Sequence, residues 1–334
     1  MRLVVWYFSV VSVCLVVLAG TAQAAAELTV YSGRGEAFVK PVIEKFERAT
    51  GIDVKVRYGD TAQLAVLIQE EGERSPADLF WGQDAGAMGA LADAGMLATL
   101  PEDVYTGLPD IYTSTTGQWV ATSGRARVIA YSTERVDAAD LPRSVFDLTD
   151  ATYRGRVALP PTNGSFQAFV TAMRVLHGDE KTLAWLQGMA ANDLKTFRNN
   201  STSIAGIADG EADFALVNNY YLPRFKATDK DYPVAQAFFA DGDVGNLVNV
   251  AGIAVLKSGD NQQAAIQLVK YLLSAAAQQY FTSIGNEYAV TDQVISNPEL
   301  VDTGVVLQTA PKINLDQLAD LQGTLELLRR AGLL

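Results

Sequence analysis

Short apolar segments alternate with helical patterns along this chain, and this alternation constrains the fold more than any other feature. Residues 28–31, 52–58 and 79–81 are typical of strands. In residues 52–58, apolar and polar side chains alternate strictly, as they do in a strand with one buried face. Helical periodicity occupies residues 41–49 and 85–97. Strands that alternate with helices form βαβ units, so we expect an α/β fold with a largely parallel sheet.

The alternation resumes after an irregular stretch at residues 98–117. Strand-like segments cover residues 127–131, 157–159, 214–217 and 248–256, and helices dominate from there to the C-terminus. The chain has 334 residues, enough for two domains, but neither a repeat nor a flexible linker divides it. We therefore expect two α/β lobes between which the chain crosses more than once. The cleft between the lobes is the expected ligand site.

The first 24 residues resemble a secretory signal. Residues 3–19 form an apolar run after Arg2, and Ala22-Gln23-Ala24 has the form of a signal-peptidase site. We expect cleavage after about Ala24 and export to an oxidising compartment. The alternative is an uncleaved anchor, because the run is close to the length that spans a bilayer. The only cysteine, Cys14, lies inside this run, so the exported chain has no disulfide.

Composition excludes several functions. The chain has 26 Lys and Arg against 38 Asp and Glu, a net charge of −12, whereas nucleic-acid binding requires basic surfaces that neutralise phosphates. His177 is the single histidine, which argues against a Cys/His zinc site and a Ser-His-Asp triad. No phosphate-binding loop, nucleophile elbow or metalloprotease motif occurs. The sequence contains no motif that calls for an enzyme, and we expect no nucleic-acid partner.

Asn218-Asn219-Tyr220-Tyr221 is the most unusual local sequence. It directly follows the apolar strand 214–217, and the ligands of open α/β sheets lie beyond the carboxyl ends of strands. At the start of a helical turn, neighbouring side chains lie about 100° apart, so both tyrosine hydroxyls can reach one point. The alternative is that the two rings pack beside the sheet, with their hydroxyls bonded to water or backbone.

Two polar loops are further candidates for ligand binding. Asn163, Gly164 and Ser165 open a helix, where free N–H groups attract an anion, although ordinary N-capping explains the same residues. Arg34 stands between two glycines at a strand end. It either reaches into the cleft as an anion donor or remains a solvated loop cation. The sequence leaves both alternatives open.

Taken in order, these segments resemble the periplasmic ferric-ion-binding proteins, the substrate-binding components of ABC iron importers. The segments that carry the resemblance are 31–33, 74–80, 123–128, 161–166 and 218–221, of which the last is the most specific. The resemblance implies a type II periplasmic-binding-protein fold, with two α/β lobes, a hinge and an interlobe cleft. Lobe 1 would comprise residues 25–125 plus about 251–300, and lobe 2 residues 126–250 plus the C-terminal helices 301–334.

The resemblance also implies a site for Fe(III) and a synergistic anion. Tyr220 and Tyr221 would bind the metal through phenolate oxygens. A free phenol loses its proton only near pH 10, but a bound cation displaces that proton. Carbonate or phosphate would lie on the anion loop and two asparagines, which here are Asn163, Gly164, Ser165, Asn200 and Asn218.

The chain departs from the family pattern at the remaining ligands. Many members have a His shortly after the first strand, where this chain has Arg34-Gly35, and a Glu after the short aromatic strand, where it has Gly82-Gln83. Other members add a Tyr in the anion loop, where this chain has Phe166. With fewer protein ligands, we expect a stronger dependence on the exogenous anion. Candidate substitutes are Gln83 and Asp84 as ligands, Arg34 as anion donor, and Arg127 and Arg224 as charge partners.

We expect iron and anion to bridge the lobes and close the hinge, which creates the surface that an inner-membrane permease recognises. The protein would act as a monomer. One rival keeps the fold and changes the ligand to an organic anion, a polyamine or a phosphonate. A less favoured rival is a secreted hydrolase with a carboxylate dyad in the cleft.

Overall fold

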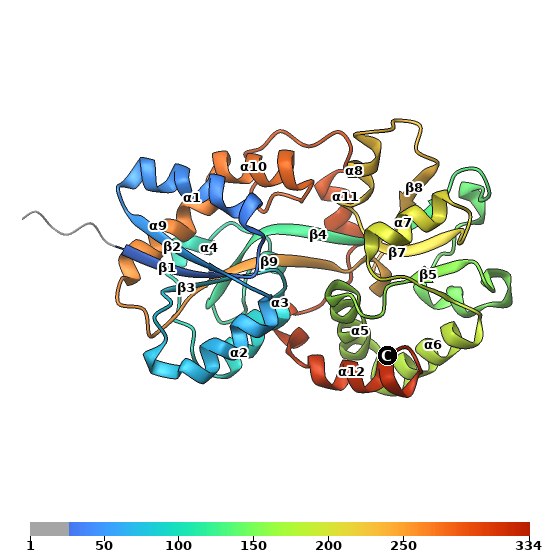
Figure 1. The fold of residues 1–334 in the computed structure, drawn as a ribbon, viewed down its shortest axis with the longest axis horizontal. Helices are drawn as coiled ribbons and strands as arrows, with labels where there is room; N and C mark the ends of the chain where they lie inside the picture. Colours follow the sequence, from blue (N-terminus) through green and yellow to red (C-terminus); the bar gives the residue numbers. More distant parts are fainter. Residues whose placement is uncertain (1–26) are drawn as a thin grey trace, which may run out of the picture.

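The protein, described by a computed structural model over residues 27–334, is built around one mixed sheet (Figure 1). The sheet order is β2-β1-β3-β9-β4-β7-β5-β6, and β8 pairs with β4 beside this path. The strands are β1 (Glu27–Ser32), β2 (Asp53–Tyr58), β3 (Leu79–Gly82), β4 (Trp119–Ser132), β5 (Val157–Leu159), β6 (Lys195–Thr196), β7 (Phe214–Asn218), β8 (Val234–Ala237) and β9 (Val248–Val255).

The sheet has a parallel group at each end and antiparallel strands in the middle. β1 is parallel to β2 and β3, and β5 is parallel to β6 and β7. In the middle, β9 runs antiparallel to β3 and β4, and β4 runs antiparallel to β7 and β8. The expectation of a largely parallel sheet is therefore right for the two ends and wrong for the centre.

β4 and β9 join two groups of elements, which we call the first and second half. Figure 1 shows both strands running through the middle of the molecule, between β1–β3 on one side and β5 and β7 on the other. The sequence predicted a strand only at 127–131, because glycine and polar residues interrupt the apolar pattern before it. In the structure, β4 begins at Trp119 and all but one of its 14 residues are buried. Pairing with β9 over its first part makes this longer strand.

Helices of the first half surround β1–β3 and the adjoining parts of β9 and β4 (Figure 1). They are α1 (Glu36–Thr50), α2 (Thr61–Glu71), α3 (Ala85–Asp93), α4 (Glu102–Tyr105), α9 (Gln262–Leu272) and α10 (Ala275–Gly285). α1 starts earlier than predicted because Pro41 lies inside the helix and not at its start, while Gly51 closes it with φ +72°. Phe46, Trp81 and Phe281 belong to the apolar cluster that fills this half.

The second half contains α5 (Gly164–His177), α6 (Asp179–Ala191), α7 (Asn200–Ala208) and α8 (Leu222–Lys226). Near the C-terminus follow α11 (Thr303–Thr309), a 3₁₀ turn at Leu315–Ala319 and α12 (Leu321–Arg330). Phe166 and Phe169 of α5 are fully buried in the larger apolar cluster, together with Trp185 of α6. This cluster fixes α5, whose first turn opens toward the centre of the molecule.

The C-terminal segment contacts both halves. Asp316, in the 3₁₀ turn, accepts a hydrogen bond from Trp119 Nε1 at 2.7 Å. Only four positions later, Asp320 pairs with Arg174 of α5 at 2.9 Å. The segment therefore ties the start of β4 to the second half, beside the cleft described below.

The expected signal peptide at residues 1–24 lies outside the described residues. Within residues 27–334, no helix combines the length and apolar character needed to cross a membrane.

Candidate metal and anion site

A cleft between the two halves brings most of the predicted site residues together. It encloses 580 Å³, and its wall includes the first turns of α2, α3 and α5, the middle of β4, the start of β9 and the end of β7. Arg34, Asn200 and Arg224 are not in the wall. The predicted residues that are in it are Gln83, Asp84, Arg127, Asn163, Gly164, Ser165, Asn218, Tyr220 and Tyr221.

Tyr220 and Tyr221 meet through their hydroxyl groups. Tyr220 Oη donates to Tyr221 Oη at 3.1 Å, and the two rings stack with their centroids 4.3 Å apart. β7 ends at Asn218, and the backbone then turns helical, with φ −80° and ψ −43° at Tyr221 directly before α8. This is the start of a helical turn, where neighbouring side chains can converge. The pair presents two adjacent oxygens to the cleft.

The surroundings of Tyr221 favour its neutral form in the absence of a cation. Burial raises the pKa of Tyr221, and the adjacent Tyr220 raises it further. Arg224 acts in the other direction: its guanidinium lies over both rings, 5.1 Å and 5.2 Å from their centroids, and its charge favours a phenolate. Arg224 thus sits as a charge partner behind the rings and not as a wall residue.

The anion loop forms one hydrogen-bonded cluster at the start of α5. Asn163 Oδ1 accepts from Ser165 N at 3.2 Å, Ser165 Oγ at 2.6 Å and Asn200 Nδ2 at 3.2 Å. Asn200 is fully buried and its Oδ1 accepts from Asn218 N at 3.3 Å. Asn163 is therefore the N-cap of α5, and Asn200 supports the loop from behind. At Gly164 no atom lies within 4 Å of where a Cβ would stand, so its backbone is open to the cleft.

Two buried arginines enter the cleft from β4. Arg127 donates to Leu216 O at 3.1 Å and to Ser165 Oγ at 3.2 Å, and Arg125 donates to Val250 O at 2.9 Å. Burial lowers the pKa of Arg127 to about 10, so the guanidinium stays charged at neutral pH. Arg125 was not predicted, although the period of two along a strand places it on the same face as Arg127.

Gln83 and Asp84 line the cleft but already make structural hydrogen bonds. Gln83 Nε2 donates to Gly33 O at 2.9 Å. Asp84 Oδ1 accepts from Ala87 N at 3.0 Å as the N-cap of α3, and burial raises the pKa of this carboxyl. Residues 27–334 hold no group of three or more His, Cys, Asp or Glu side chains suited to a metal ion. A metal in this cleft would depend on the tyrosine pair.

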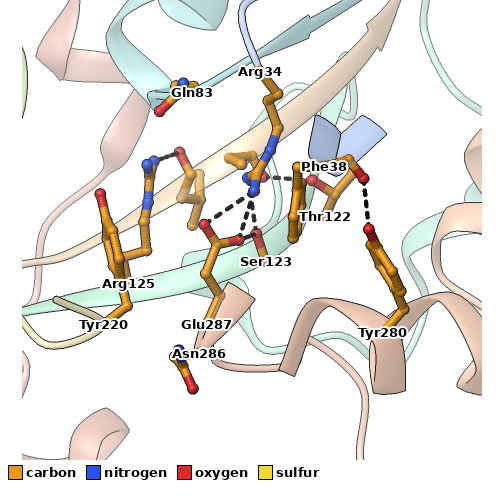
Figure 2. Close-up of polar contacts among 12 residues, drawn as sticks. Arg34, Phe38, Gln83, Thr122, Ser123, Arg125, Tyr220, Tyr280, Asn286 and Glu287 are labelled. Atoms are coloured by element: carbon orange, nitrogen blue, oxygen red, sulfur yellow. Dashed lines mark hydrogen bonds and ion pairs between the residues drawn. The ribbon is translucent and has the colours of Figure 1, made fainter. Parts of the chain in front are cut away.

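Arg34 is placed away from the cleft wall, in a buried ion pair (Figure 2). Its Nη2 lies 3.0 Å from both carboxylate oxygens of Glu287, and its Nη1 donates to Ser123 Oγ at 3.3 Å. The guanidinium also lies 4.5 Å from the centroid of the Phe38 ring. In Figure 2, Arg125 and not Arg34 stands beside Tyr220. The sequence analysis considered Arg34 as an anion donor or as a solvated cation. Neither alternative includes its contact with Glu287, which lies more than 250 positions away in the chain.

Sequence and structure comparisons identify the family. The family model described as bacterial extracellular solute-binding protein matches residues 42–307. This chain belongs to that family. The major ferric iron-binding protein of Neisseria meningitidis serogroup B is 33% identical over 324 residues, which is 95% of this chain and 96% of that protein.

Solved structures of extracellular solute-binding proteins share the fold. Iron-bound HitA from Pseudomonas aeruginosa has a TM-score of 0.83 and 34% identity, covering 92% of this chain and 99% of that one. Trichodesmium IdiA (FutA), solved with iron and citrate ligands, has a TM-score of 0.81 and 26% identity, covering 92% of this chain and 100% of that one. The resemblance to periplasmic ferric-ion-binding proteins and the two-lobed periplasmic-binding-protein fold are thereby confirmed. The family and these relatives are binding proteins.

Proposed function

We propose that this chain is the substrate-binding component of an ABC importer and captures Fe(III) in the cleft between its lobes. The observation that carries the proposal is the pair of tyrosine hydroxyls, 3.1 Å apart, in the cleft wall. The iron-binding relatives support the same cargo. Fe(III) is a hard cation that favours anionic oxygen, and it displaces the phenol protons as it binds. The protein performs no catalysis.

A synergistic anion, carbonate or phosphate in its simplest form, completes the site. The open backbone at Gly164 and the buried cation of Arg127 supply donors at the start of α5, and the Ser165 hydroxyl would exchange its bond to Asn163 Oδ1 for one to the anion. Asn163, Asn200 and Asn218 hold this loop in place. Two phenolates reduce the metal charge from +3 to +1, and a divalent anion takes the centre to −1, which the adjacent cation of Arg127 balances.

The lobes close on the cargo about the strands β4 and β9. Lobe 1 comprises residues 25–125 plus about 251–300, and lobe 2 residues 126–250 plus the C-terminal helices, although the turn at Leu315–Ala319 also contacts lobe 1. Wall residues come from both lobes, so bound iron and anion favour the closed form. The exported, monomeric protein then delivers iron to an inner-membrane permease, with the signal peptide removed after about Ala24.

Metal analysis together with a visible spectrum tests the proposed function. The purified protein, loaded with Fe(III) and bicarbonate, should contain one iron per chain and show a phenolate-to-iron charge-transfer band. The double variant Tyr220→Phe/Tyr221→Phe should show neither. If wild type gives no band and no bound iron, but binds a polyamine or a phosphonate, the proposed iron function is wrong and the protein binds that other ligand.

A further inference from the structure

Asn219 directly precedes the tyrosine pair and lies outside the cleft wall, with only 1% of its surface exposed. We infer that Asn219 is a positioning residue, which brings the hydroxyls of Tyr220 and Tyr221 together without touching the cargo. Its side chain ends β7 and keeps the end of this strand bonded to β4. This inference rests on the iron-binding function proposed above and adds the residue on which the geometry of the metal ligands depends.

The side chain of Asn219 takes the place of a backbone carbonyl at the end of β7. The antiparallel strands β4 and β7 pair Arg127 with Asn218, so Ala126 and Asn219 come next in the register. Where such a pair is hydrogen-bonded, its two residues exchange two backbone bonds. Asn219 N donates to Ala126 O at 2.9 Å, but Ala126 N donates to Asn219 Oδ1, also at 2.9 Å. The ladder between the strands therefore continues through a side chain.

This exchange releases the backbone carbonyl of Asn219, and the chain turns at this point. Asn219 O accepts instead from Gln236 Nε2 of β8 at 3.3 Å. At Tyr221 the backbone is already helical. If Ala126 N bonded to Asn219 O, β7 would extend toward the tyrosines, and neighbouring side chains of a strand lie on opposite faces. The hydroxyls of Tyr220 and Tyr221 would then point apart.

Burial makes this role depend on a side chain with a hydrogen-bond acceptor. Ala126 is fully buried, so its N–H requires an acceptor inside the protein. The Asn219 side-chain carbonyl is that acceptor, and an aliphatic side chain of the same size would leave the N–H unpaired. The amide also donates, from Nδ2 to Asn286 O at 3.4 Å. Asn286 closes α10, so one side chain fixes the tyrosine turn both to β4 and to the end of that helix.

The separation of the two tyrosine oxygens decides how they bind a metal. In the structure these oxygens lie 3.1 Å apart, so one cation can contact both. A side chain that orients a ligand without binding the metal typically contributes about 10–100-fold to metal affinity. Loss of the Asn219 acceptor should therefore weaken iron binding even though both tyrosines remain in the chain.

Three variants separate positioning from a general loss of stability. Asn219→Leu removes the acceptor and the donor with a side chain of similar size, whereas Asn219→Asp keeps an acceptor for Ala126 N. The matched control is Asn246→Leu, because Asn246 is fully buried, accepts from Phe239 N at 2.8 Å and lies outside the cleft wall. Thermal unfolding shows whether each variant is folded. If Asn219→Leu is not, Asn219→Ala takes its place, since it removes the same oxygen.

Crystal structures of the iron-free proteins give the distance between the two tyrosine oxygens, and competition for Fe(III) with a chromogenic chelator in bicarbonate gives the iron affinity. In Asn219→Leu the oxygens should lie beyond hydrogen-bond distance, about 3.5 Å. The iron affinity of this variant should fall by about 10–100-fold, with an altered charge-transfer band. Asn219→Asp should retain the contact between the hydroxyls. Asn246→Leu should unfold at a lower temperature than wild type but keep the wild-type affinity and band.

The inference is wrong, and the iron function stands, if Asn219→Leu keeps the hydroxyl contact or the wild-type affinity. It is also wrong if Asn219→Asp separates the hydroxyls as Asn219→Leu does, or if Asn246→Leu loses as much affinity as Asn219→Leu. If the hydroxyls separate in Asn219→Leu but wild type binds no iron, Asn219 keeps its positioning role and the proposed function fails.

Discussion

The hydroxyl of Tyr220 donates its hydrogen bond to the hydroxyl of Tyr221 across 3.1 Å, and the two rings stack at 4.3 Å. Consecutive side chains within a strand lie on opposite faces of the sheet, so two neighbouring hydroxyls can meet only where the strand has ended. The arrangement follows from the change of backbone conformation between β7 and α8. It makes the two oxygens a unit, in which a change at one tyrosine alters the surroundings of the other.

Single substitutions should therefore each abolish tight iron binding. Tyr220→Phe and Tyr221→Phe each remove one ligand oxygen, and we expect the apparent iron affinity to fall by more than about 100-fold, because even residues that only orient a ligand cost about 10–100-fold. Tyr271→Phe, on α9 against Phe46 and outside the cleft wall, is the control and should bind as wild type. Competition with a chromogenic chelator measures the affinity. Retention of wild-type affinity by either single variant would contradict the two-ligand assignment.

Acid should release the iron. Burial and the neighbouring Tyr220 raise the pKa of Tyr221, so at neutral pH both the proton and iron compete for this oxygen. Loading should release about two protons per iron from the tyrosines, and iron affinity should consequently fall as pH falls. A pH-stat counts the released protons, with the double tyrosine variant as control. An iron-release titration that stays flat down to about pH 4, near the ordinary pKa of Glu, would contradict this prediction.

The ion pair between Arg34 and Glu287 should be important for stability. Both side chains are 7% exposed, so Glu287→Gln leaves a buried guanidinium without its charge partner, which costs about 3 kcal/mol of unfolding free energy. Asp103→Asn breaks an exposed pair with Lys270 and should cost no more than about 1 kcal/mol. Urea unfolding of both variants measures the difference.

The same pair also allows a test of whether Arg34 binds the anion. The double variant Arg34→Met/Glu287→Leu removes both charges together and should recover part of the lost stability. Because Arg34 lies outside the cleft wall, this variant should bind iron as wild type does. A stable double variant that has lost iron binding would restore Arg34 to the anion site.

Loading should make the protein more compact. Wall residues from both lobes surround the cleft, so iron and anion favour a closed arrangement about β4 and β9. X-ray scattering should give a smaller radius of gyration for the iron-loaded protein than for the iron-free protein. The double tyrosine variant, treated in the same way, should show no change. If the iron-loaded and iron-free wild type have the same radius of gyration, the proposed hinge closure is wrong.

Local features of the site could be predicted because they depend on neighbours in the chain. Asp60 caps α2, Asn163 caps α5 and Gly51 ends α1, each through groups a few positions away. The convergence of Tyr220 and Tyr221 depends on the same short range, since it needs only a strand that ends and a helix that begins.

Features that depend on distant partners could not be predicted. From the sequence, Arg34 is either an anion donor or a loop cation, and only the fold brings Glu287 to it across 253 positions. Arg125 lies in a segment whose glycine and serine hide the strand, and only pairing with β9 extends β4 back to Trp119. Asn249 and the C-terminal Leu318 reach the cleft wall for the same reason, because packing of remote elements places them there.

The sequence by itself determined the α/β class, the positions of most strands and helices, and the tyrosine pair, because periodicity, caps and strand ends act over a few residues. Tertiary structure decided which charges are free. The fold buries Arg34 in an ion pair with Glu287 and places Arg125, which was not predicted, beside Tyr220 (Figure 2). The two aspartates of the cleft wall, Asp60 and Asp84, are the N-caps of α2 and α3. Burial and pairing arise only when remote segments meet, so the chemistry of the cleft is a property of the folded chain.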